Sequence, residues 1–212
     1  GAIFYPQKFV KLIEKIFIEN NILLCFDEMQ AGFGRTGKKF GFEHYKVKPD
    51  LICVGKGMGS GFPLAGVIGR KKILDIADIG SMSSTHSSNP VVCSAGIATI
   101  DEIENKKLVS KSAKLGYILF EKLNEIKDKY SNYISSINGK GLIAAVIFKD
   151  QKSNKPLIDL TNRICDNCLK NKLLVVKTGR ESLKIGPPLI IKERNLIKGI
   201  EIFEKSIKEA LI

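Results

Sequence analysis

Two short apolar runs that each end in polar residues constrain the fold of this chain more than any other feature. The first, Ile22–Phe26, leads directly into Asp27. The second, Leu51–Val54, leads into a glycine-rich stretch, Gly55–Gly61, which contains Lys56. Open α/β sheets build ligand sites where neighbouring strands deliver polar side chains at their carboxyl ends. The pattern therefore predicts two adjacent buried strands with a ligand site at one edge of the sheet.

Lys56 is the residue in this pattern with the most specific chemistry. The glycines on either side leave space around its amine, and a lysine amine in its free-base form can attack a carbonyl carbon and form a Schiff base. Asp27 taken alone has a simpler interpretation as a turn or helix cap, a common role for Asp after a strand. The joint spacing of Asp27, Gln30 and Lys56 favours a cofactor site over that interpretation.

The residues around these runs have the alternating pattern of an α/β fold. Helical periodicity predicts a helix over 9–20 before the first strand. A loop with one helical turn at 42–45 is expected before the second strand, and a third strand is expected over 64–68. After a serine-rich loop over 80–88, Asn89 as cap and Pro90 as first residue predict a helix that runs to about residue 105.

After residue 105 the order of elements changes. A strongly amphipathic helix over 108–129 precedes two strands, a helix, two further strands and a final helix, expected over 133–137, 142–148, 157–171, 173–176, 182–185 and 192–211. Strands with helices packed on one side are typical of an α+β domain. The sequence thus predicts two domains, residues 1–105 and residues 106–212.

The net charge of +12 raises the question of nucleic-acid binding. The lysines are dispersed over predicted helices and interleaved with acidic residues, which is typical of solvated helix faces rather than of a phosphate-binding patch. No apolar stretch approaches the roughly 20 residues that span a bilayer, and no signal peptide opens the chain. We therefore expect no nucleic-acid partner and no membrane partner.

The five cysteines lie mostly in apolar runs and indicate reduced thiols in a cytoplasmic protein. Cys165 and Cys168 have the spacing of a redox or metal-binding pair, but no second pair accompanies them, so a structural role is favoured. No metal site is expected. His44 and His86 are assigned no catalytic role, and Arg35 is expected to be structural in its glycine-rich turn.

Four blocks of the chain, in order, strongly resemble the class-III, fold-type I aminotransferases that use pyridoxal 5'-phosphate (PLP). The blocks are Asp27–Gly37, Pro49–Val67, Ser84–Pro90 and Leu183–Ile191. The resemblance covers essentially the whole chain. It implies an α/β fold in which residues 1–105 belong to a large PLP-binding domain with a mostly parallel sheet, and residues 106–212 form a small α+β domain.

The resemblance implies a role for each residue that matches the family's motifs. Lys56 matches the lysine that forms a Schiff base with PLP and then shuttles a proton at the substrate's α-carbon, roles that suit an amine. Asp27 matches the carboxylate that pairs with the pyridinium nitrogen, and Gln30 matches the contact to the ring hydroxyl. Thr85 matches a threonine that reaches a cofactor phosphate from the neighbouring subunit, so a homodimer with shared active sites is expected.

Two features depart from the family's pattern. Relatives are about twice this length, so the chain is expected to be the carboxy-terminal part of such an enzyme, without the half that supplies the phosphate loop. Lys184 stands where many relatives place an arginine that grips the substrate carboxylate, and lysine offers a point charge in place of arginine's planar fork. Lys184 is therefore either a loose carboxylate ligand or an exposed strand residue.

The function implied by the resemblance is transfer of an amino group between an amine or amino-acid donor and a 2-oxo acid acceptor. A PLP-dependent aminomutase and a decarboxylating transaminase would share Lys56, Asp27 and Gln30, so both stay open. A non-catalytic truncated remnant that acts as a dimerisation module is a further alternative from a different class.

Overall fold

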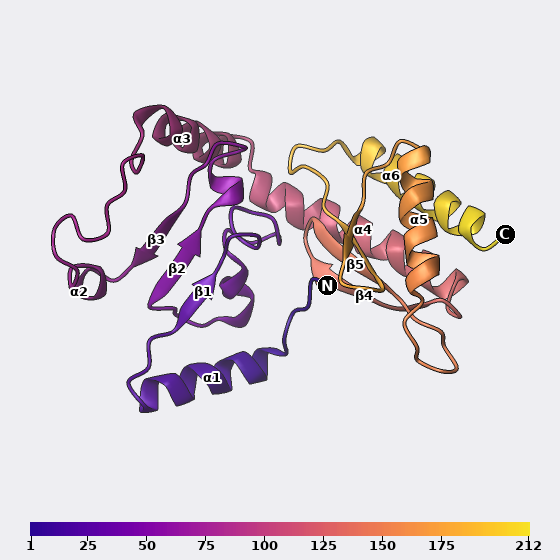
Figure 1. The fold of residues 1–212 in the computed structure, drawn as a ribbon, viewed down its shortest axis with the longest axis horizontal. Coiled ribbons are helices and arrows are strands. Elements are labelled where there is room, and N and C mark those ends of the chain that lie inside the picture. The colour runs from indigo at the N-terminus through magenta and orange to yellow at the C-terminus, as the bar shows by residue number, and fades with distance from the viewer. The chain divides into compact units, whose positions relative to one another are not determined.

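The computed structural model describes residues 1–212, which form two compact units. Residues 5–109 make up the amino-terminal unit, and residues 1–4 together with 110–212 make up the carboxy-terminal unit. Both units combine helices with a sheet (Figure 1). No helix in either unit combines the length and the apolar character needed to cross a bilayer.

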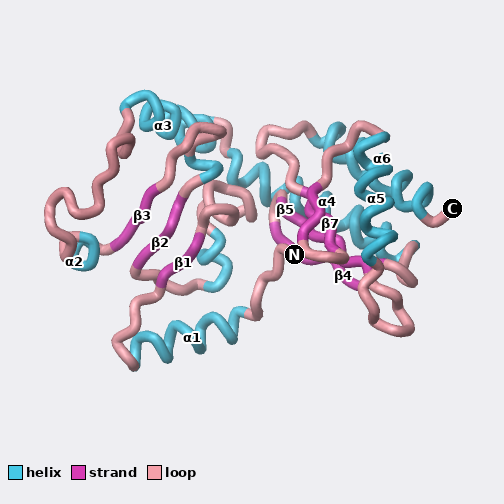
Figure 2. Tube along the Cα trace, in the orientation of Figure 1, coloured by secondary structure: helices cyan, strands magenta, loops and turns pink.

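The amino-terminal unit contains a three-stranded sheet in the order β1-β2-β3, drawn side by side in Figure 2. Its elements are α1 (Gln7–Glu19), β1 (Cys25–Asp27), β2 (Leu51–Val54), β3 (Gly66–Gly69), α2 (Lys71–Leu74) and α3 (Pro90–Asn105). β1 and β2 are parallel, with Asp27 opposite Cys53, whereas β2 and β3 are antiparallel. The parallel pairing brings the carboxyl ends of β1 and β2 to the same edge of the sheet.

Helix α3 begins as its sequence predicts. The Asn89 side chain accepts hydrogen bonds from the backbone N–H groups of Val91 (3.0 Å) and Val92 (3.4 Å). Pro90 occupies the first helical position, where its missing N–H group costs nothing. The cap satisfies donors that have no partner inside the helix, so the start of α3 at residue 90 is confirmed.

β1 begins later than predicted, at Cys25 rather than at Ile22. The preceding residues complete the end of α1 in a Schellman motif. Asn21 has a left-handed conformation (φ 55°), and the Ile22 N–H group donates to the carbonyl oxygen of Phe17 at 2.8 Å. Ile22 therefore closes the helix instead of pairing in the sheet.

The same motif delays β6, which begins at Val176 rather than at Leu173. Lys172 has a φ of 65°, and the Leu173 N–H group donates to the carbonyl oxygen of Cys168 at 2.8 Å. In both places the backbone N–H group of an apolar residue closes the end of a helix, and the chain becomes extended only after that residue.

β1 and β2 are less buried than their apolar sequences indicate. Val54, at the end of β2, is 1% exposed, but Cys25 and Asp27 in β1 are exposed. β1 pairs only with β2 and forms an edge of this sheet. The expectation of two buried strands is therefore wrong for β1.

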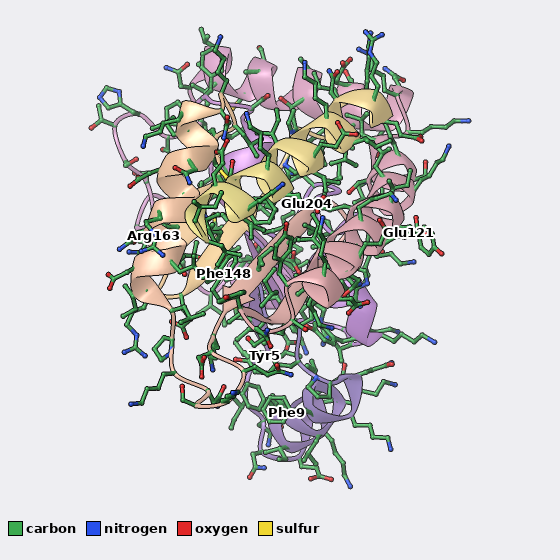
Figure 3. The ribbon with its side chains drawn as sticks, turned by 90° about the vertical axis from the view of Figure 1, so that its right-hand side faces the viewer. Tyr5, Phe9, Glu121, Phe148, Arg163 and Glu204 are labelled. Atoms are coloured by element: carbon green, nitrogen blue, oxygen red, sulfur yellow. The ribbon has the colours of Figure 1, made fainter.

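The carboxy-terminal unit contains a four-stranded antiparallel sheet in the order β4-β5-β7-β6. Its elements are α4 (Leu108–Lys129), β4 (Ile134–Lys140), β5 (Ile143–Phe148), α5 (Ile158–Lys170), β6 (Val176–Thr178), β7 (Ser182–Ile185) and α6 (Glu193–Ala210). Figure 3 shows the three helices of this unit, with α6 between α5 and α4 and the strands behind them.

The core of this unit lies between the sheet and the three helices. Alternate residues of β5, namely Ala144, Val146 and Phe148, are fully buried, as expected for the face of a strand that meets a helix layer. Each helix contributes a stripe at helical spacing, which includes Leu115, Leu119, Leu123, Leu160, Ile164, Cys168, Leu196, Ile200, Phe203 and Ile207. The apolar periodicity of the sequence is thus satisfied within this unit.

Two helical glycines of this unit are predicted to respond oppositely to the same substitution. A Cβ atom on Gly116 would lie 2.5 Å from Gly141 Cα and 2.6 Å from its carbonyl oxygen, whereas a Cβ atom on Gly199 would meet only Leu173 Cδ1 at 3.7 Å. We expect Gly116→Ala to lower the free energy of unfolding by roughly 1–3 kcal/mol. Gly199→Ala should raise it by about 0.4–1 kcal/mol, because alanine restricts the unfolded chain.

Urea denaturation of both variants and the parent measures these changes. Stabilisation by both substitutions would contradict the close approach of α4 to the turn at Gly141.

Candidate functional site

The carboxyl ends of β1 and β2 form the edge of the sheet at which the sequence predicts a site. Asp27 is the last residue of β1, and Lys56 follows the last residue of β2 after one glycine. The backbone N–H group of Glu28 donates to the carbonyl oxygen of Cys53 at 2.8 Å, which continues the parallel pairing past the end of β1. The backbone hydrogen bonds between the two strands therefore continue to their carboxyl ends, where the polar residues lie.

The loops that follow the two strands pack against each other. A Cβ atom on Gly55 would lie 2.5 Å from the sulfur of Met29, so the absence of a side chain at Gly55 allows this close approach. A Cβ atom on Gly57 would lie 3.8 Å from Phe33 Cβ. The two residues that flank Lys56 thus both face the loop that begins at Asp27.

Lys56 has a left-handed backbone conformation, with a φ of 46°. Phe33 and Ser60, in the same two loops, also have positive φ values, 55° and 49°. Such conformations are uncommon in residues that carry a Cβ atom, and each costs roughly 1–3 kcal/mol. The loops that present Lys56 are therefore strained, and contacts around them must hold them in this geometry.

Asp27 has the simpler of the two roles that its sequence position allows, and its cofactor contact stays a prediction. One carboxylate oxygen accepts a hydrogen bond from the backbone N–H group of Met29 at 3.0 Å, which makes Asp27 a turn cap. The side chain is nevertheless exposed, as are those of Gln30 and Lys56. A carboxylate, an amide and an amine are thus open to solvent in the two loops at one edge of the sheet.

The other two residues predicted to bind ligands belong to different regions. Thr85 lies in the exposed loop between α2 and α3 and makes no hydrogen bond with Asp27, Gln30 or Lys56. Lys184 lies in β7 of the carboxy-terminal unit, opposite Ala145, and its side chain is half-buried.

Glu28 is the feature of this edge that the sequence reasoning missed. Its side chain is 2% exposed, and its carboxylate oxygens accept hydrogen bonds from the backbone N–H groups of Gly41 and Phe42, both at 2.8 Å. Burial raises the pKa of Glu28, and these two hydrogen bonds oppose that shift. The available signal was strand alternation, because the residue after an outward-facing Asp27 points inward.

An aromatic cluster packs around the loop that Glu28 holds. The ring centroids are separated by 5.7 Å for Phe33 and Phe40, by 5.9 Å for Phe40 and Phe42, and by 5.9 Å for Phe26 and Phe42. Tyr45 extends the cluster, at 6.5 Å from Phe26. These contacts connect β1 to the loop and to the 3₁₀ segment Gly41–Tyr45, so they help to hold the strained backbone at Phe33.

The comparison with known proteins identifies the family of this chain. The profile of the family described as aminotransferase class-III matches residues 1–207. The chain therefore belongs to the class-III aminotransferase family.

Individual relatives match the whole chain but only part of their own length. An alanine/serine racemase of Pyrococcus horikoshii is 38% identical, over 100% of this chain and 44% of that protein. An acetylornithine aminotransferase of Clostridium acetobutylicum is 33% identical, over 98% of this chain and 51% of that protein. The crystal structure of acetylornithine aminotransferase from Elizabethkingia anophelis superimposes with a TM-score of 0.88 and 30% identity, covering 96% of this chain and 50% of that one. The chain thus spans about half the length of the relatives it matches.

The thiols of Cys25 and Cys168 are predicted to differ in reactivity. Cys25 is exposed, whereas Cys168 is fully buried in the core of the carboxy-terminal unit, and burial raises the pKa of its thiol to about 11. Partial burial and the hydrogen bond with Cys53 also raise the pKa of the Cys25 thiol, but its exposure leads us to expect faster alkylation at Cys25 than at Cys168 in the folded chain at pH 8. A rise from 9.0 to about 11 lowers the thiolate fraction of Cys168 about hundredfold relative to the unfolded chain.

Iodoacetamide labelling followed by peptide mass mapping tests this prediction, with the urea-unfolded chain as the control in which both thiols react. Rapid labelling of Cys168 in the folded chain would exclude its place in the core.

Proposed function

We propose that the protein containing these residues is a PLP-dependent aminotransferase that moves an amino group between an amine or amino-acid donor and a 2-oxo acid. Membership of the class-III family supports this activity. The observation that carries the proposal is the convergence of the Asp27 and Lys56 loops at one edge of the sheet, through the parallel pairing and the contact of Met29 with Gly55.

The residues at this edge fit the chemistry of PLP. When bound, PLP supplies an aldehyde carbon and a pyridinium ring that accepts electrons from the substrate. The exposed amine of Lys56 suits the aldehyde, the carboxylate of Asp27 suits the protonated ring nitrogen, and the amide of Gln30 suits the ring hydroxyl.

Lys56 has two tasks in this proposal. Its Nζ atom would hold the cofactor covalently, and as a free amine it would remove the proton from the substrate's α-carbon. Gly55 and Gly57 carry no side chains that would crowd this amine, and the Lys56 side chain is exposed.

Asp27 and Gln30 have supporting tasks. A carboxylate beside a ring nitrogen favours the protonated ring by charge attraction. The hydrogen bond from Met29 N–H to one oxygen of Asp27 limits the rotation of that carboxylate. Gln30 lies in the turn closed by the hydrogen bond from Gly32 N–H to Glu28 O (3.0 Å), so its backbone position is defined by the same segment.

The wider organisation of the enzyme is part of the same proposal. Residues 1–105 would complete a large cofactor-binding domain, and residues 106–212 would form a small domain in which Lys184 contacts a substrate carboxylate. Thr85 would reach the cofactor phosphate of a neighbouring subunit in a homodimer with shared active sites. The five free cysteines support a reducing compartment, the cytoplasm.

Covalent trapping tests the role of Lys56. We expect borohydride treatment in the presence of PLP to label Lys56 selectively, as read by peptide mass mapping, in the natural full-length protein. Lys56→Ala should lose this label and all amino transfer, because the attacking amine is gone. Lys46→Ala is a matched control, since Lys46 is also exposed and also has a positive φ (56°).

Labelling scattered over many lysines would reject an organised cofactor site. The interpretation as a non-catalytic dimerisation module would then replace the enzyme.

A racemase is a second candidate, favoured by the alanine/serine racemase among the relatives. Racemisation and transamination both begin with loss of the α-proton to a base such as Lys56. A racemase returns a proton to the α-carbon from the opposite face, whereas an aminotransferase releases the carbon skeleton of the donor as an oxo compound.

Incubation with L-alanine distinguishes the two activities. An aminotransferase is expected to form pyruvate and to need a 2-oxo acid for turnover. A racemase forms D-alanine without any 2-oxo acid. Chiral chromatography of reactions with and without 2-oxoglutarate measures the D-alanine formed. D-alanine as the main product in both mixtures would overturn the transaminase proposal.

A further inference from the structure

Glu28 connects three segments of the candidate site. Its backbone N–H group binds the carbonyl oxygen of Cys53 (2.8 Å), three residues before Lys56. Its carbonyl oxygen accepts from Gly32 N–H (3.0 Å) and closes the turn that contains Gln30. Its carboxylate accepts from the N–H groups of Gly41 and Phe42, at 2.8 Å each. One residue thus links the end of β2, the turn after β1 and the segment Gly41–Tyr45.

The carboxylate of Glu28 lies in a closely fitted space. A Cβ atom on Gly41 would lie 2.8 Å from Ala31 Cβ and 3.2 Å from Glu28 Oε2, so a side chain at Gly41 would displace one of them. A buried carboxylate is costly unless hydrogen bonds satisfy it. The two backbone donors satisfy both oxygens of Glu28. Loss of either hydrogen bond would leave a buried carboxylate oxygen without a donor, which is destabilising, so these bonds hold the segment at Gly41 in place.

The position of Glu28 relates this network directly to the proposed cofactor contacts. Asp27 precedes Glu28 in the chain and faces solvent while Glu28 faces inward. Gln30 lies between the two ends of the hydrogen bond from Gly32 to Glu28. A shift of Glu28 would therefore move Asp27 and Gln30 together.

We propose that Glu28 is a positioning residue for the cofactor: by binding Gly41 and Phe42 it fixes the placement of Asp27 and Gln30 relative to Lys56. This inference rests on the proposed function. In this role Glu28 acts through the backbone that carries its neighbours, since its carboxylate is buried and bound to Gly41 and Phe42.

Asp50 offers a matched control for substitution of Glu28. Its carboxylate also accepts a backbone hydrogen bond, from Leu24 N–H at 2.9 Å, and it pairs with Arg70 at 3.3 Å. It lies in the same unit but just before β2, at the amino end of that strand. Glu28→Gln and Asp50→Asn both replace a carboxylate by an amide of the same shape, at opposite ends of the paired strands β1 and β2.

Amide hydrogen exchange of the cofactor-free protein is the first measurement. Glu28→Gln places an NH₂ group against one of two backbone donors, so we expect faster exchange at Gly41 and Phe42 that extends through residues 28–33 and 55–58. Asp50→Asn should leave these segments unchanged. Faster exchange confined to residues 40–43 would overturn the proposal, because the site loops would then be independent of Glu28.

Absorbance of the lysine-bound cofactor is the second measurement, made on the full-length protein. A displaced Asp27 holds the ring proton less firmly, and loss of the positive ring charge favours protonation at the lysine linkage. Glu28→Gln should therefore raise the pH midpoint of the absorbance titration and weaken PLP binding about tenfold, equivalent to one charge-assisted hydrogen bond. Asp50→Asn should change neither quantity.

Gly41→Ala disturbs the same contact from the opposite side and should shift the midpoint in the same direction. An unchanged midpoint in both variants refutes the positioning role while the parent's Lys56 band keeps the proposed function intact. A parent without any Lys56 band would refute the proposed function itself. If both variants fail to fold, Glu28 has a purely structural role and the proposal is rejected.

Discussion

The parallel pairing of β1 with β2 is the interaction on which the candidate site depends. Asp27 lies opposite Cys53 in this pairing, and the hydrogen bond from Glu28 to Cys53 extends it by one residue. Parallel strands end at the same edge, so residues that are far apart in the chain, Asp27 and Lys56, follow neighbouring strand ends. An antiparallel pairing of the same two segments would have separated them by the full length of a strand.

The loops that follow these strands have a strained backbone, and close packing holds them in that conformation. Positive φ values at Phe33 and Lys56 are unfavourable in isolation. They persist because the aromatic cluster around Phe33, the contact of Met29 with Gly55 and the buried carboxylate of Glu28 all restrain the same backbone. Strain of this kind is common at ligand sites, where a side chain has to remain available to a ligand instead of packing in the core.

The two units differ in how completely their apolar patterns are buried. In the carboxy-terminal unit, helical stripes and alternate strand residues meet in one core, which was predictable from periodicity alone. In α1 of the amino-terminal unit, by contrast, only Val10 is buried, whereas Phe9, Leu12 and Ile16 are exposed despite their helical spacing. Periodicity indicates which face of an element is apolar, but it does not indicate how much of that face these residues cover.

The five longer helices, both ends of β2 and the cap at Asn89 follow from local spacing and residue chemistry, so they could be predicted without the structure, whereas the single-turn helix α2 was not predicted. The family resemblance could also be read without the structure, and it is the basis on which Asp27, Gln30 and Lys56 are predicted to be site residues. The structure shows that β1 and β6 begin later than their apolar runs indicate, because Schellman turns at Ile22 and Leu173 end the preceding helices through local hydrogen bonds that strand propensity does not register. It also revealed Glu28, whose partners Gly41 and Phe42 lie more than ten residues away. A carboxylate's role depends on which backbone donors surround it after folding, and that arrangement is set by packing rather than by its neighbours in the chain.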